Sequence, residues 1–87
     1  MGSLYHQLGS ALRSFIKRFD PHGDEEQMKK DVEEILEMAE RIGAPLEEDA
    51  EGFKEEFARF LEEKGDPDFR ERLLKMALRL EQETREI

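Results

Sequence analysis

Three short breaks divide this sequence, and at each of them residues that end a helix stand next to residues that begin one. The breaks are Asp20-Pro21-His22-Gly23, Gly43-Ala44-Pro45 and Gly65-Asp66-Pro67. Glycine terminates helices, aspartate caps their first turn, and proline fits the first helical position. Between the breaks, apolar residues recur every three or four positions, which is the spacing of one helix face. The sequence therefore predicts an all-α fold, a compact four-helix bundle with short loops and helices over about 3–19, 24–42, 46–64 and 67–86.

The last stretch has the widest apolar face of the four. Its main stripe is Phe69, Leu73, Met76, Ala77 and Leu80. Leu74 and Leu78 add a second stripe beside the first, four residues apart. Because so wide a face needs more than one neighbour to cover it, this helix is predicted to be the central one, against which all the other helices pack.

The third stretch contains a weak point at Gly52, since glycine disfavours a helix interior by about 1 kcal/mol relative to alanine. One continuous helix is the favoured interpretation. Asp49 could also cap a fresh start, which would make the piece from Leu46 to Glu51 a separate turn.

Composition narrows the class of protein. The chain has 87 residues, which predicts a single domain over 1–87, and it has no cysteine, which excludes disulfides and thiolate metal sites. The net charge is −9, and residues 1–19 hold three basic and no acidic residues, so residues 20–87 carry −12. An acidic surface disfavours nucleic acid as a partner, and no apolar run is long enough to cross a membrane. The start, Met1-Gly2-Ser3, lacks the pattern of a signal peptide, which predicts a cytoplasmic location, or none for a recombinant chain.

The first break resembles the opening of an EF-hand calcium loop. Counting from Asp20, the first and fifth places are Asp20 and Asp24, but the third is His22, a poor calcium ligand. The sixth place, where the loop needs glycine, is Glu25, and the twelfth is Asp31 instead of glutamate. We interpret the segment as a turn followed by a helix cap, so no metal or cofactor is predicted; Asp20, His22 and Asp24 stay weak metal candidates.

Catalytic patterns are missing from the sequence. No serine has an evident histidine and acid beside it, and there is no glycine-rich phosphate loop. Carboxylate runs such as Glu47-Glu48-Asp49 fit solvated helix faces, and no carboxylate is evidently isolated in an apolar pocket. The sequence therefore predicts a protein that is not an enzyme.

The first helix, 3–19, is the best candidate for a functional element, because it is both basic and amphipathic. Such helices bind partner grooves or membrane surfaces. A partner could be contacted through Leu8, Leu12, Phe15 and Phe19. The simpler interpretation is that this face joins the core, where it covers the stripe of the last helix.

Caps, glycine stops, first-turn prolines and charged outer faces agree throughout the chain. That agreement resembles the style of de novo designed all-helical proteins. Gly9, Ser10 and the link from Phe19 to Gly23 are more irregular, and they resemble natural helix-loop-helix fragments joined to redesigned helices. The resemblance implies a monomeric structural scaffold with no biochemical activity and no partner. The alternative is an interaction module that presents helix 3–19 to a partner groove. Bundle handedness, oligomeric state and the choice between regular and orthogonal packing stay open.

Overall fold

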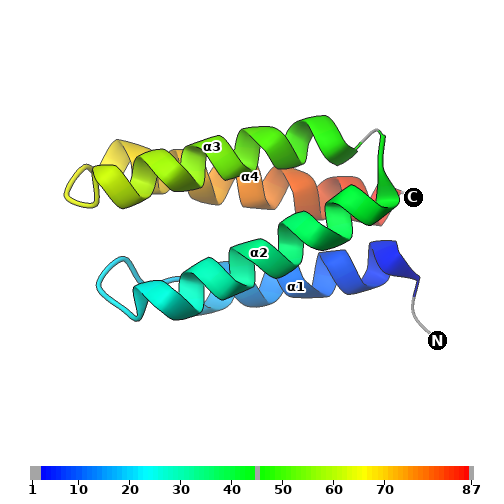
Figure 1. Ribbon diagram of the computed structural model, residues 1–87, viewed down its shortest axis with the longest axis horizontal. Coiled ribbons are helices and arrows are strands. Elements are labelled where there is room, and N and C mark those ends of the chain that lie inside the picture. The colour runs from blue at the N-terminus through cyan, green and yellow to red at the C-terminus, as the bar shows by residue number, and fades with distance from the viewer. Residues whose placement is uncertain (1–2, 45, 87) are drawn as a thin grey trace.

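Four helices make up the computed structural model, which describes residues 3–44 and 46–86 (Figure 1). They are α1 (Leu4–Arg18), α2 (Glu25–Ile42), α3 (Leu46–Glu62) and α4 (Pro67–Glu86). Every regular element in the described ranges is a helix, so the predicted all-α fold is confirmed. The predicted ends are right to within two residues, the largest difference being the C-terminus of α3. The predicted role of Pro45 lies outside the described residues.

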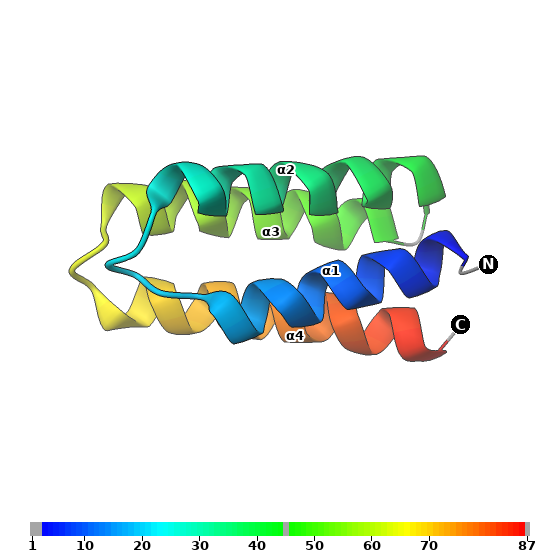
Figure 2. The same ribbon diagram turned by 90° about the horizontal axis from the view of Figure 1, so that it is seen from below.

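The helices form an up-and-down bundle in which each helix is antiparallel to its two neighbours (Figures 1 and 2). Helix α1 packs against α2 and α4, and α3 packs against the same two helices. The α1–α2 and α3–α4 turns lie at one end of the bundle, and the α2–α3 link lies at the other. Among the described residues, no Cα atom of α4 lies within 8 Å of a Cα atom of α2, so the prediction that all the other helices pack on α4 is wrong. In a four-cornered bundle the backbone of each helix lies close to only two others, and helices on the diagonal meet only through large side chains.

The predicted helix signals act locally, with one exception. Ser3 caps α1 by accepting a hydrogen bond from His6 N, and Asp24 caps α2 by accepting from Glu26 N and Gln27 N. Gly43 ends α2 with a φ of 82°, a conformation that only glycine adopts without strain. The spacing of Asp24 and Gln27 predicts a capping box, in which the side-chain oxygen of Gln27 accepts a hydrogen bond from Asp24 N. The described residues show no such bond, and the side-chain amide of Gln27 donates to Asp31 Oδ1 at 3.2 Å, one turn further into the helix.

The core is apolar and is filled mainly by leucine and phenylalanine. Its largest fully buried side chains are Phe53, Phe60, Leu8, Leu12, Ile35, Leu46, Leu73 and Leu80. Phenylalanine rings also bridge the diagonal: Phe15 of α1 meets Phe53 of α3 edge-on, with centroids 5.6 Å apart. The second stripe predicted on α4 is not part of this core, since Leu74 is half-buried and Leu78 is 46% exposed. The two neighbours of α4, which are α1 and α3, cover only part of its circumference, and the second stripe lies outside that part.

Helix α3 runs without interruption through Gly52, so the favoured interpretation of a continuous helix is confirmed. Gly52 faces α4, where an added Cβ would lie 2.9 Å from Met76 Cε. That atom is the end of a flexible side chain, which can move aside.

Replacing Gly52 with alanine should therefore stabilise the protein by about 0.5–1 kcal/mol, because alanine restricts the unfolded chain and favours the helix. Gly9 offers a matched control. A Cβ at Gly9 would lie 2.7 Å from Thr84 Oγ1, on a short side chain held at the α1–α4 contact. The same substitution there should give no gain. Urea unfolding followed by circular dichroism measures both changes, and an equal gain at Gly9 would contradict the packing argument.

Candidate functional site

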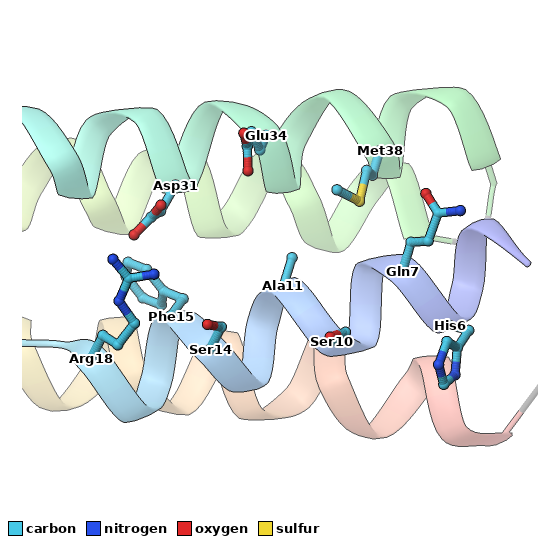
Figure 3. Close-up of a pocket in the computed structure, with 10 residues that line it drawn as sticks. All are labelled: His6, Gln7, Ser10, Ala11, Ser14, Phe15, Arg18, Asp31, Glu34 and Met38. Atoms are coloured by element: carbon cyan, nitrogen blue, oxygen red, sulfur yellow. The ribbon is translucent and has the colours of Figure 1, made fainter. Parts of the chain in front are cut away.

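A groove of about 420 Å³ lies between α1 and α2 (Figure 3). Three small residues on α1 leave it open, because side chains of this size cannot reach α2. They are Ser10, Ala11 and Ser14. The other residues that line the groove are His6, Gln7, Phe15 and Arg18 from α1 and Asp31, Glu34 and Met38 from α2.

The charged side chains of the groove come from both helices. Figure 3 shows Arg18 and Asp31 extending toward one another from opposite walls. No ion pair joins them within the described residues, and Asp31 Oδ1 accepts a hydrogen bond from the side-chain amide of Gln27. Arg18, Asp31 and Glu34 can attract small ions, but in an open groove water screens such charges strongly.

The groove has none of the arrangements that nucleophilic catalysis needs. His6 points away from α2 in Figure 3, and among the described residues no hydrogen bond joins it to Ser10 or Ser14. A serine becomes a nucleophile only when a base within about 3 Å takes its proton. Ser10 and Ser14 are therefore not arranged as activated nucleophiles.

The turn between α1 and α2 contains the three weak metal candidates, and the structure gives two of them local roles. Asp20 Oδ1 accepts a hydrogen bond from His22 N at 2.9 Å, and Asp24 Oδ1 accepts from Glu26 N at 3.0 Å. These bonds form the turn and helix cap of our interpretation. Across residues 3–44 and 46–86, no three histidine, aspartate or glutamate side chains gather as metal ligands do.

An ion pair ties this turn to the neighbouring one at the same end of the bundle. Lys64 Nζ donates to Glu25 Oε2 at 2.8 Å. This hydrogen bond and the charge of Lys64 lower the pKa of Glu25. Both side chains are more than a third exposed, so the pair contributes little to stability.

The most unusual polar group is Glu81, in the contact between α1 and α4. Its side chain is 4% exposed, and Oε1 accepts hydrogen bonds from Arg13 at 2.9 Å and from Arg85 at 2.6 Å. Burial disfavours the charged carboxylate, but the hydrogen bonds from the two guanidinium groups outweigh it and lower the pKa of Glu81. The site is thus a buried carboxylate held in its charged form by two arginines on Oε1, and not a poised general acid. On α3, Glu56 keeps its Oε2 away from water without a hydrogen-bond partner, for which the structure offers no explanation.

The sequence interpretation missed the burial of Glu81, although the signal is present. Ala77, Leu80, Glu81 and Thr84 follow the spacing of one helix face, so the carboxylate lies on the buried side. The apolar spacing gives no partner for Arg13, which lies 68 residues away from Glu81 in the sequence. Gly9 lies one turn before Arg13 and, by lacking a side chain, allows α1 to approach Thr84 closely.

The residues proposed for partner contact lie inward. Leu8, Leu12 and Phe15 are buried in the core, and Phe19 is half-buried beside Phe60, with ring centroids 5.3 Å apart. No helix in the described part of the chain is both long enough and apolar enough to pass through a bilayer.

Comparison of the chain with protein-family models, with curated proteins and with solved structures gives no match.

Proposed function

We propose that this chain is a designed, monomeric helical scaffold without catalytic activity. One observation carries the proposal: the buried carboxylate Glu81, the group from which chemistry would be expected, accepts hydrogen bonds from both Arg13 and Arg85 on Oε1. Because these bonds lower its pKa, Glu81 stays charged at neutral pH and holds α1 against α4.

The agreement of the local signals supports a designed origin. Ser3 and Asp24 cap their helices, Gly43 ends one, and Asp66 Oδ1 accepts from Asp68 N at the start of α4. Natural chains usually break one or two such rules at a functional site.

Thermal unfolding and ligand titration test this proposal together. We expect one cooperative transition at high temperature, unchanged over a wide range of protein concentration. Amide chemical shifts at Asp20, His22 and Asp24 should stay constant when calcium or zinc is added. A low, concentration-dependent transition would contradict the monomeric scaffold, and saturable shifts in this turn would contradict the absence of ligand binding.

A second candidate function is an interaction module based on α1, and the observation that favours it is the basic charge of this helix. Arg13, Lys17 and Arg18 stand on α1 without any carboxylate. Because Leu8 and Leu12 are buried, α1 would have to leave the bundle to offer its apolar face to a groove. Hydrogen exchange separates the two functions: the module requires the amides of α1 to exchange faster than those of α2 and α3, whereas the scaffold requires similar protection.

A further inference from the structure

The charges of the bundle are divided between two layers (Figure 2). One layer pairs α1, which has three basic and no acidic residues, with α4, which has five of each, so its net charge is +3. The other pairs α2, with three basic and seven acidic residues, with α3, with two and seven, and carries −9. The acidic chain therefore has one basic side, which the fold creates by placing its first and last helices together.

The outer surface of the basic layer has an apolar centre. Leu78 is one of the two large apolar side chains that are exposed among the described residues, and Leu74 lies one turn before it. The contact between Arg13 and Glu81 sets the antiparallel register of α1 and α4. Three residues after Arg13 in α1 and three residues before Glu81 in α4, this register brings the half-buried Ile16 to the level of Leu78.

Cations of both helices flank this centre, together with Glu71, which lies one turn before Leu74 and pairs with Lys75. Lys17 is exposed and has no ion pair within the described chain. Arg13 and Arg85 share one carboxylate, that of Glu81, and their side chains stay 46% and 65% exposed. We name this surface the α1/α4 face; it consists of Arg13, Ile16, Lys17, Leu74, Leu78 and Arg85.

We propose that the α1/α4 face binds an acidic amphipathic helix of a partner protein, which lies along the line where the two helices meet. The side-chain ridges of one helix pack into the grooves between the side-chain rows of another. Leucine-type side chains of the partner would cover Leu74 and Leu78, and its flanking carboxylates would pair with Lys17 and Arg13. An apolar centre within a charged rim is the usual anatomy of such an interface.

The shape of the charge distribution favours a narrow acidic helix over an extended anionic membrane. The bundle measures 38 × 22 × 18 Å, so the −9 layer lies directly behind the basic one. A broad anionic membrane surface interacts with the electrostatic fields of both layers, the basic one and the acidic one. A helix about 10 Å wide contacts the basic layer alone. A second copy is a poor occupant, because the apolar stripes of its acidic helices are buried in its own core.

The inference goes beyond the scaffold proposed above and does not depend on it. The probe is a fluorescent synthetic peptide about 20 residues long, which is long enough to fold as a helix. It carries leucine on one helical face and glutamate beside that face. Fluorescence anisotropy should show saturable binding that weakens as sodium chloride rises from about 50 to about 300 mM. The same peptide with lysine in place of glutamate should not bind.

Two matched pairs of variants locate the contact. Leu78→Gln should weaken binding about tenfold, and Leu4→Gln, at the other exposed leucine, should leave it unchanged. Lys17→Glu should also weaken binding about tenfold, whereas Lys54→Glu, on α3, should not. Circular dichroism confirms that each variant folds. Equal loss within either pair, binding of the lysine peptide, tighter binding to phosphatidylserine vesicles, or self-association that displaces the peptide would each overturn the proposal.

Discussion

Phe53→Ala should lower the free energy of unfolding by about 3–5 kcal/mol, the largest loss we expect from any single substitution. Phe53 is fully buried at the centre of the bundle, where its ring meets Phe15 across the diagonal. Truncation removes that contact and leaves a cavity that the rigid helices around it cannot close. For a domain of 87 residues, whose total stability is about 5–10 kcal/mol, this loss should populate the unfolded state measurably.

Urea unfolding followed by circular dichroism measures this loss, and Phe69→Ala is the matched control. Phe69 is half-buried near the start of α4, where Arg72 lies 5.6 Å from the centre of its ring. Because water can reach this site, the same truncation should cost only about 1 kcal/mol. Equal losses at Phe53 and Phe69 would show that the bundle core is not packed around the diagonal phenylalanines.

The double variant Arg13→Ala, Arg85→Ala should destabilise the protein by about 2–4 kcal/mol at neutral pH. Both donors to Glu81 are lost, and a carboxylate that is almost fully buried is left without a partner. The expected loss lies toward the low end for a buried pair, because water can enter where the half-exposed arginines stood. Glu81→Leu should be nearly neutral, since it removes the charge together with its need for partners.

The pH dependence of stability should change sign between the parent protein and the double variant. In the parent, the pKa of Glu81 is lowered below its usual 4.5, so its contribution is present above that pH and is lost as the pH falls through the lowered value. In the variant, burial acts alone and raises the pKa, so lowering the pH toward about 4.5 should increase stability. Other carboxylates titrate too, so each curve is compared with that of the same protein carrying Glu81→Gln. If the difference curve of the parent protein and that of the double variant run parallel with pH, Arg13 and Arg85 do not control the pKa of Glu81.

Sequence patterns predicted the helices well because their signals are local. The caps Ser3 and Asp24 and the stop at Gly43 act within one turn of the backbone, so they need no tertiary information. Apolar spacing likewise placed Leu8, Leu12, Phe53 and the other core residues on inward faces. Gln27 shows the limit of this reasoning, because its spacing from Asp24 fits a capping box, yet its side-chain amide donates to Asp31 one turn further into the helix.

What the sequence determined by itself is the set of four helices and the side that each turns inward, because both depend on contacts between residues a few positions apart. Only the tertiary structure decided which helices are neighbours. That choice left Leu78 exposed, set Glu81 between Arg13 and Arg85, and joined the basic α1 to α4 on one side of the bundle. These features depend on residues up to 68 positions apart, which meet only when the chain closes on itself.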